Sequence, residues 1–169
     1  MKIVIVGTAY PMRGGIAQFN ALLYKYFSAG NDVKMYSFKR QYPGMFFPGK
    51  TQFEQDEPVF KIPDDKNIIC VDSVNPINWI STGRKIAKEN ADLIIFKYWL
   101  PFFAPCFATI SYIAKKYSKA KVLFICDNVL PHENRFGDMI FTKLAFSQSD
   151  NFNVMSMTVA EELKLFTKV

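Results

Sequence analysis

The fold class is indicated most clearly by the run Lys2-Ile-Val-Ile-Val-Gly7 and by Gly14-Gly15, which follows after a short loop. The run is short, β-branched and apolar, which is typical of a strand buried in a parallel sheet. Beyond the glycine pair, apolar residues recur at helical spacing until Ala29-Gly30 ends the pattern. A second strand is expected over residues 32–38. This order of strand, helix and strand predicts a βαβ unit.

The same alternation continues along the rest of the chain. Further strands are predicted over residues 68–71, 93–98, 122–126 and 152–155, and helices over 75–87, 102–117 and 136–146, with a last helix at the capping box Thr158-Val-Ala-Glu161. This pattern predicts one α/β domain over residues 1–169, a Rossmann-like, doubly wound and mainly parallel sheet with helices on both faces. Ligands of such sheets bind at the carboxyl ends of the strands.

Residues 40–66 interrupt the alternation. The segment is rich in proline and glycine, and it contains the apolar run Met45-Phe46-Phe47 and the acidic run Glu54-Gln-Asp-Glu57. Connections of this length inside a compact domain are usually either functional or disordered. We therefore expect a long surface loop here.

Composition and charge exclude some classes of protein. Half of the 169 residues are hydrophobic and 16% are aromatic, so the chain can bury a large core and is not intrinsically disordered. The net charge is +6, and residues 1–50 carry all of it, with seven basic side chains against the single acid Asp32. A one-sided basic balance points to a phosphate-bearing ligand or an anionic membrane face. A nucleic-acid partner is not expected, because no recognition motif accompanies the basic charge.

The cysteines and the single histidine limit the possible chemistry. Cys70, Cys106 and Cys126 are odd in number and lack metal-binding spacing, so we expect buried thiols in a reducing cytoplasm. The one histidine, His132, excludes a multi-histidine metal site within this chain. We expect no metal and no redox cofactor.

Two apolar segments are similar in composition to membrane or export signals. The run that opens the chain is too short for the apolar core of a secretory signal. Residues 93–114 carry a single charge, Lys97, and nearly match a membrane span in length, but Pro101 and Pro105 interrupt them. We expect a buried strand followed by a buried helix.

The first strand–loop–helix turn is the candidate phosphate site. Gly14 and Gly15 precede the helix, where free N–H groups and a partial positive charge attract anions. The turn matches neither the G-x-G-x-x-G fingerprint nor a P-loop. The alternative is that the glycines only form a tight entry to the helix.

Two further clusters lie where strands are predicted to end. Asp127, Asn128, His132 and Glu133 follow the fifth strand and bring proton-transfer and hydrogen-bonding groups to the expected ligand edge. The alternative is an ordinary surface loop. Trp99 follows the fourth strand, where it could form an aromatic wall for a sugar or lipid, or simply pack in the core.

Taken in order, these segments resemble the N-terminal domain of GT-B glycosyltransferases, most closely the retaining family-4 (group 1) type. The resemblance rests on the Pro11…Gly14-Gly15-Ile16 turn, Gly30-Asn-Asp-Val33, Trp99-Leu-Pro-Phe102, Asp127-Asn-Val-Leu-Pro-His132-Glu133 and the strand from Asp150 to Ser156. It covers nearly the whole chain. Each motif is individually weak, and the specificity lies in the order and spacing of the set.

The resemblance implies roles for single residues. Gly14 and Gly15 would face the donor phosphates, Asp127 and His132 would be the candidate catalytic residues, and Arg13, Trp99, Asn128 and Glu133 would line the acceptor and sugar pocket. Members of the family often place a histidine directly after the fifth strand. In this sequence that position is Asp127, and His132 follows five residues later.

The resemblance also implies a division of labour. The N-terminal domain of such enzymes binds the acceptor, and a second Rossmann-like domain, absent from this chain, binds the nucleotide sugar. The expected function is therefore the acceptor-binding half of a retaining hexosyltransferase, inactive alone. It would act on a saccharide or lipid-linked acceptor in cell-surface polysaccharide synthesis. Its expected location is the cytoplasm, peripheral to an anionic membrane. The alternative is a non-catalytic Rossmann-like module that binds a membrane surface or a protein.

Overall fold

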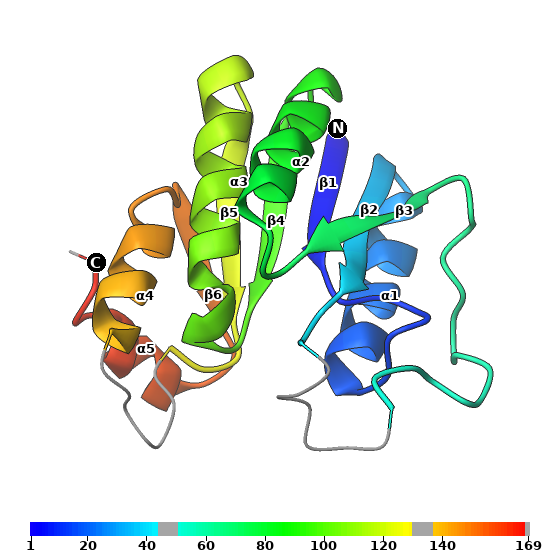
Figure 1. Ribbon diagram of the computed structural model, residues 1–169, viewed down its shortest axis with the longest axis horizontal. Helices are drawn as coiled ribbons and strands as arrows, with labels where there is room; N and C mark the ends of the chain where they lie inside the picture. The colour runs from blue at the N-terminus through cyan, green and yellow to red at the C-terminus, as the bar shows by residue number, and fades with distance from the viewer. Residues whose placement is uncertain (44–50, 130–136, 168–169) are drawn as a thin grey trace.

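A computed structural model describes residues 1–43, 51–129 and 137–167 (Figure 1). The strands are β1 (Lys2–Gly7), β2 (Asp32–Arg40), β3 (Asn67–Asp72), β4 (Leu93–Tyr98), β5 (Lys121–Cys126) and β6 (Asn151–Val154). The helices are α1 (Gly15–Ser28), α2 (Pro76–Lys88), α3 (Ala104–Tyr117), α4 (Asp138–Phe146) and α5 (Met157–Leu163), and a 3₁₀ turn, Pro101–Phe103, leads into α3.

The strands form one sheet in the order β3-β2-β1-β4-β5-β6, and every neighbouring pair is parallel. The chain builds outward from β1 in one direction and then, from β4, in the other. The strand order therefore reverses between β1 and β4, which makes this the switch point at which open α/β sheets bind ligands. The predicted doubly wound parallel sheet is confirmed.

Each face of the sheet has its own core. Alternate residues of β1, such as Val4 and Val6, point into the core beneath α2 and α3, whereas Ile3 and Ile5 point toward α1. Figure 1 shows α2 and α3 on the near face and α1 behind. This alternation is why the strands read as continuous apolar runs in the sequence.

The larger core contains a cluster of packed aromatic rings. The rings of Phe96 and Phe124 stack across β4 and β5 with centroids 5.1 Å apart, and Phe107 of α3 lies 5.2 Å from Phe96. Offset aromatic pairs add to the stability that burial alone provides. Burial also raises the pKa of the Cys126 thiol to about 12, so this cysteine is an inert core residue.

Local signals in the sequence account for most helix boundaries. Asn75 caps α2 as expected, because its side chain accepts hydrogen bonds from the N–H groups of Ile77 and Asn78. The last helix differs from the prediction. Its cap is Ser156, whose Oγ accepts from Val159 N at 3.3 Å, and the predicted cap Thr158 lies inside the helix. Serine is the better N-cap of the two, and Ser156 follows shortly after the end of β6 at Val154.

The apolar stretch over residues 93–114 forms β4, the 3₁₀ turn and most of α3, as the prolines predicted. In the described part of the chain, no helix combines the length and the hydropathy that crossing a membrane requires.

Candidate functional site

The carboxyl edge of the sheet brings the ends of β1, β4 and β5 together at the switch point. Gly7 ends β1, Lys97 is the penultimate residue of β4, and Asp127 directly follows β5. Their positions match the edge at which the sequence predicted a ligand site. The loop between β1 and α1 borders the same edge.

Amide side chains of neighbouring segments hold this loop in place. Asn20 Nδ2 donates to the carbonyl of Thr8 at 2.8 Å, and Asn67 Nδ2 donates to the carbonyl of Tyr10 at 3.0 Å. The Thr8 hydroxyl donates to Gln41 Oε1 at 3.1 Å. Because Thr8, Asn20 and Gln41 are buried, the loss of any of these bonds would leave a desolvated polar group without a partner. The loop is therefore pre-organised by its supports.

The second half of the long loop is hydrogen-bonded to the same segment. Arg13 N donates to the carbonyl of Gln52, and Glu54 N donates to the carbonyl of Pro11, both at 2.9 Å. The Gln52 side chain in turn bonds the backbone N–H and carbonyl of Tyr42. These hydrogen bonds hold the second half of the long loop in place, and residues 51–57 thus form one wall of the candidate site.

Gly14 and Gly15 stand at the exposed start of α1. Gly14 has φ +109°, a conformation that disfavours any side chain, and no side chain caps the helix. A Cβ added at Gly15 would meet nothing within 4 Å. Of these two residues, the fold requires glycine at Gly14, whereas at Gly15 the open space leaves room for a ligand. The first N–H groups of α1 remain available to an anion.

Lys97 and Asp127 form the central charged pair of the edge. Lys97 Nζ lies 2.5 Å from Asp127 Oδ1, and the lysine side chain is 1% exposed while that of the aspartate is 25% exposed. The same ammonium lies 3.6 Å from the ring centroid of Phe19, on α1. An ammonium against an aromatic face is attracted by the ring. These contacts join α1 to the ends of β4 and β5.

Gly7 and Asn20 complete this corner. A Cβ at Gly7 would lie 2.9 Å from Asn20 Nδ2 and 3.5 Å from Lys97 Cβ, so the close approach of the two side chains requires glycine here. Asn20 Oδ1 is buried and has no hydrogen-bond partner within the described ranges. Such an unsatisfied acceptor is rare in native proteins and marks a place for a water or ligand donor.

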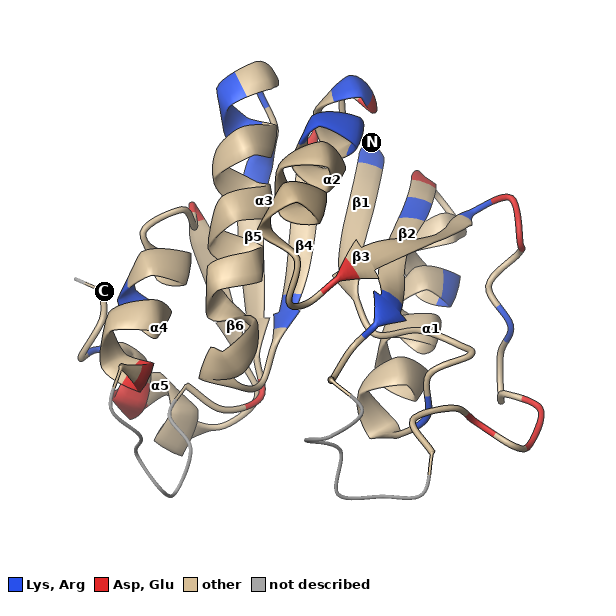
Figure 2. Cartoon of the chain, viewed as in Figure 1, with Lys and Arg blue, Asp and Glu red and all other residues tan. Residues whose placement is uncertain are grey.

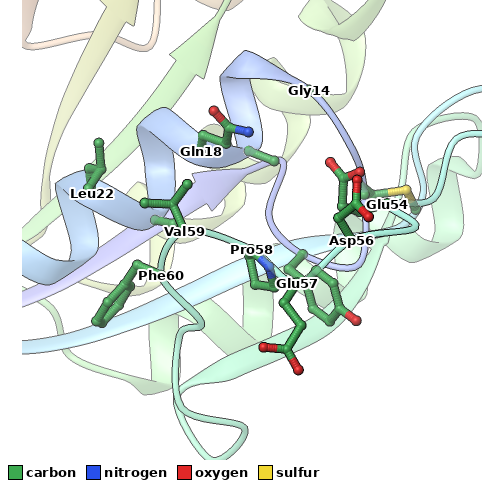
Figure 3. A pocket seen from close by; sticks show the side chains of 13 residues that line it. Gly14, Gln18, Leu22, Glu54, Asp56, Glu57, Pro58, Val59 and Phe60 are labelled. Carbon is green, nitrogen blue, oxygen red and sulfur yellow. The ribbon is translucent and has the colours of Figure 1, made fainter.

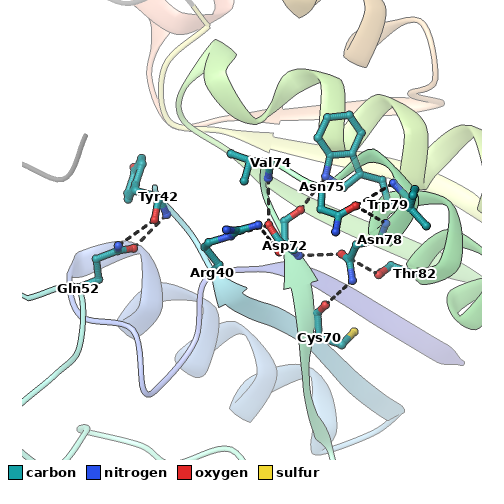
Figure 4. A network of polar contacts seen from close by, with 11 residues as sticks. Arg40, Tyr42, Gln52, Cys70, Asp72, Val74, Asn75, Asn78, Trp79 and Thr82 are labelled. Carbon is teal, nitrogen blue, oxygen red and sulfur yellow. Dashed lines mark hydrogen bonds and ion pairs between the residues drawn. The ribbon is translucent and has the colours of Figure 1, made fainter. Parts of the chain in front are cut away.

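Arg40 and Asp72 form a second charged pair at the ends of β2 and β3 (Figure 4). The guanidinium makes two bonds, Nε to Oδ1 at 2.9 Å and Nη2 to Oδ2 at 2.7 Å. The backbone of Asp72 is held by Asn78 and by Trp79, whose Nε1 donates to the Asp72 carbonyl at 2.7 Å. This network fixes Arg40, which is partly exposed, at the rim of the edge.

Trp99 packs against the core, which is one of the two roles left open by the sequence, and its role beside a sugar or lipid stays a prediction. Its ring centroid lies 4.4 Å from that of the buried Phe103, and its Nε1 donates to the hydroxyl of Tyr42 at 3.4 Å. Tyr42 stacks on the exposed Phe102, with centroids 5.8 Å apart. The inner part of this aromatic group belongs to the core, and its outer part forms a wall beside Arg40.

The other predicted site residues are placed only in part. Arg13 and Asn128 are exposed at the edge. His132 and Glu133 lie outside the described residues, as do Phe46 and Phe47 of the long loop. The structure therefore brings Asp127 and Trp99 to the same edge as the glycine turn, and it does not test the roles of His132 and Glu133.

The described basic side chains of residues 1–43 do not form one surface. Lys2 and Lys34 both pair with Glu89 at the amino edge of the sheet, whereas Arg40 pairs with Asp72 at the carboxyl edge. Figure 2 shows blue segments at both edges and at the ends of α2 and α3. Charge that is clustered in the sequence is thus divided between opposite ends of the sheet.

Sequence reasoning missed Lys97, Arg40 and Asn20 as site residues. A signal existed for Lys97, because it is the single charge in the apolar stretch 93–114. A lone charge at the end of a buried strand needs a partner, and the next strand of a parallel sheet supplies one. Asn20 gave no such signal, because its role depends on how closely α1 approaches Gly7.

No protein-family profile matches the chain, and no curated protein matches it. Solved structures do match. One is the UDP-GlcNAc 2-epimerase from Methanocaldococcus jannaschii, with a TM-score of 0.59 and 13% identity, over 98% of this chain and 42% of the epimerase chain. Another is an alpha-glucosyltransferase in complex with UDP and a 13-mer DNA containing a central A:G mismatch, with a TM-score of 0.55 and 14% identity, over 94% of this chain and 38% of that chain.

These likenesses show the fold, a Rossmann-like α/β domain of the kind found in GT-B enzymes. The chain spans about two fifths of the length of each of the two solved structures. At such identities a shared fold does not by itself carry a shared activity.

Proposed function

We propose that this chain is the acceptor-side half of a glycosyltransferase that uses a nucleotide sugar, of the retaining family-4 type that the sequence resembles. One observation carries the proposal: the uncapped start of α1 and the Lys97–Asp127 pair both lie at the carboxyl edge of the sheet, and Lys97 contacts Phe19 of α1. A site for a diphosphate and a site for sugar hydroxyls are then neighbours. The fold shared with two sugar-nucleotide enzymes supports the same conclusion.

The two parts of the edge have complementary tasks in this proposal. The N–H groups of Gly15 and Ile16 stabilise the negative charge that develops on the departing diphosphate, as oriented backbone dipoles do in other transfer reactions. Asp127 accepts a hydrogen bond from a hydroxyl of the transferred sugar or of the acceptor. Lys97 is a positioning residue, because it is too buried to touch a substrate and holds one oxygen of Asp127.

The remaining residues complete the pocket. The Tyr42–Phe102 stack and Trp99 provide an apolar wall, and Arg13, Arg40 and Asn128 provide donors at its rim. His132 and Glu133 remain candidates from the sequence. The acceptor is a saccharide or a lipid-linked saccharide, and the nucleotide sugar is bound mainly by a second domain. In this proposal the enzyme works in the cytoplasm, at an anionic membrane, and needs no redox cofactor or metal from this domain.

One observation favours the alternative, a non-catalytic binding module. Helix α4 exposes Ile140, Phe141 and Leu144, which is unusual for a short surface helix. Burial of this surface against a protein would suit a module as well as an enzyme, so it does not displace the transferase proposal.

The test is a transfer assay on the protein encoded by the complete reading frame, with UDP-, GDP- and dTDP-linked sugars and a panel of saccharide acceptors. We expect transfer by that protein, negligible transfer by residues 1–169 alone, and a loss of about 100-fold or more in Asp127→Asn and in Gly15→Val. Epimerisation of the nucleotide sugar without transfer would contradict the proposal, as would undiminished transfer by a folded Gly15→Val protein.

A further inference from the structure

Two cavities lie next to each other between α1 and the second half of the long loop. The first has a volume of about 130 Å³ and runs from Gly14 along α1 (Figure 3). The second has a volume of about 200 Å³ and reaches Asn67 at the start of β3. Tyr10, Ala21 and Phe60 line both, so the cavities are direct neighbours, and we call the pair the α1 groove.

The size of the α1 groove fits small rings. Each cavity exceeds several-fold the roughly 30 Å³ that one water molecule occupies in the liquid. A ring-sized group can therefore replace a cluster of waters in each. The two cavities are neighbours that share three lining residues, which suits two linked rings, one in each cavity.

The side chains of the α1 groove have the chemistry of a saccharide site. Tyr10 and Phe60 offer aromatic surface to the apolar faces of sugar rings. Gln18 in the first cavity offers an amide, whereas the amide of Asn67 in the second is engaged by the Tyr10 carbonyl and the Ser37 hydroxyl. Carboxylates accept hydrogen bonds from hydroxyl groups, and Asp56 is one of several at the rim. A cleft with aromatic walls and a few placed polar groups is the usual form of a small-ligand site.

The charge of the α1 groove then selects among saccharides. Residues 54–65 contain five acidic side chains and one basic one, in a chain whose net charge is +6. Lys61 pairs with Asp64 at 3.1 Å, whereas Glu54, Asp56 and Glu57 have no ion-pair partner within the described residues. Figure 3 shows the carboxylates of Glu54 and Asp56 beside the Gly14 turn. A sugar acid would be repelled here, and an amino sugar would be attracted.

We propose that the α1 groove binds two successive rings of the acceptor oligosaccharide, and that it selects neutral and amino sugars over acidic ones. The inference rests on the proposed function and adds the chemical class of the acceptor. The groove opens at Gly14, so a saccharide seated in it has one end at the turn where the donor phosphates are proposed to lie.

Binding to residues 1–169 tests this inference without any transfer reaction. The probes are three trisaccharides of similar size: a chitosan trisaccharide, which is cationic at pH 6, neutral cellotriose, and anionic trigalacturonate. At low salt we expect the cationic probe to bind most tightly and the anionic probe at least about ten-fold more weakly than cellotriose. Equal affinities, or tighter binding of trigalacturonate, would overturn the charge selection.

Two sets of variants locate the binding. Phe60→Ala removes the shared aromatic wall and should weaken cellotriose binding by about five-fold. The double variant Asp56→Asn/Glu57→Gln should weaken only the cationic probe, also by about five-fold. Asp65→Asn in the same loop and Tyr26→Ala on α1, 72% exposed, lie outside the groove and serve as controls. Circular dichroism and urea unfolding confirm that each variant is folded.

The outcomes separate this inference from the proposed function. Saccharide binding that the groove variants leave unchanged would overturn the α1 groove and leave an acceptor site elsewhere. An absence of binding by all three probes up to their solubility would overturn the inference, whatever the transfer assay shows. Transfer by the complete protein to an acidic acceptor, with no effect of Phe60→Ala, would retain the transferase and also reject the groove.

Discussion

Lys97 Nζ lies 2.5 Å from Asp127 Oδ1, but the two partners differ in burial, because the lysine side chain is 1% exposed and the aspartate side chain is 25% exposed. The pair is thus a buried cation held by a carboxylate that still reaches solvent. This asymmetry determines what each residue does. Asp127 can meet a ligand, whereas Lys97 acts only through Asp127 and through its contact with Phe19.

The first prediction follows from that asymmetry. Asp127→Ala leaves a buried ammonium without its partner and should lower the free energy of unfolding by about 3 kcal/mol. Lys97→Met leaves a carboxylate that water can reach and should cost about 1 kcal/mol or less. Urea unfolding of both variants measures the difference. A larger loss in Lys97→Met than in Asp127→Ala would contradict the assignment of the roles.

The second prediction concerns two glycines that differ in their surroundings. At Gly83, an added Cβ would lie 2.7 Å from Ile113 Cβ and 2.9 Å from the Ile110 carbonyl, where α2 packs on α3. Gly83→Ala should therefore destabilise the protein by about 1–3 kcal/mol, although alanine favours a helix. Gly15→Ala, which meets no neighbour, is the matched control and should be neutral or slightly stabilising. Equal thermal midpoints of the two variants would show that the helices are not packed this closely.

The sequence carried enough information for the fold and for part of the site. A strand buried on both faces reads as an apolar run, and the Asn75-Pro76 start of α2 is a local signal. The Lys97–Asp127 pair joins residues on different strands, so it depends on the strand order, which no local pattern encodes. The hydrogen bond from Arg13 N to the Gln52 carbonyl likewise depends on where the long loop returns to the sheet.

The third prediction concerns stability in acid. Burial alone would raise the pKa of Glu89, but hydrogen bonds from Lys34 and Tyr36 outweigh it and the pKa is lowered. The pKa of Asp150 is lowered in the same way, with burial opposed by bonds from Val122 N, Lys115 and Lys121. A carboxyl group with a lowered native pKa contributes stability that is complete above its unfolded pKa and is lost as the pH falls through the native value.

We therefore expect the free energy of unfolding to fall as the pH drops below about 4.5, the ordinary range of these carboxyl groups. In the double variant Glu89→Gln/Asp150→Asn the dependence between about pH 4.5 and pH 2 should be shallower. Urea midpoints across this range measure both slopes. The variant Asp65→Asn, which changes an exposed acid, is the control. An unchanged slope in the double variant would contradict the account of these two sites.

The fourth prediction concerns the membrane. If basic residues and the Phe46-Phe47 pair hold the protein on an anionic surface, it should co-sediment with vesicles that contain phosphatidylglycerol and not with neutral ones. Binding should fall with added salt and weaken in Phe46→Ser/Phe47→Ser. Equal binding to both kinds of vesicle, or to neither, would favour a soluble acceptor.

The most direct test of the central claim is a titration of ¹⁵N-labelled residues 1–169 with UDP, followed by amide chemical shifts, with uridine as the matched ligand without phosphates. We expect UDP to shift the amides of Gly14, Gly15 and Ile16 and uridine to leave them unshifted, because the proposed ligand of the start of α1 is the diphosphate. Gly15→Val should abolish the effect. Shifts confined to the basic ends of α2 and α3, or identical shifts with uridine, would contradict a diphosphate site at the switch point.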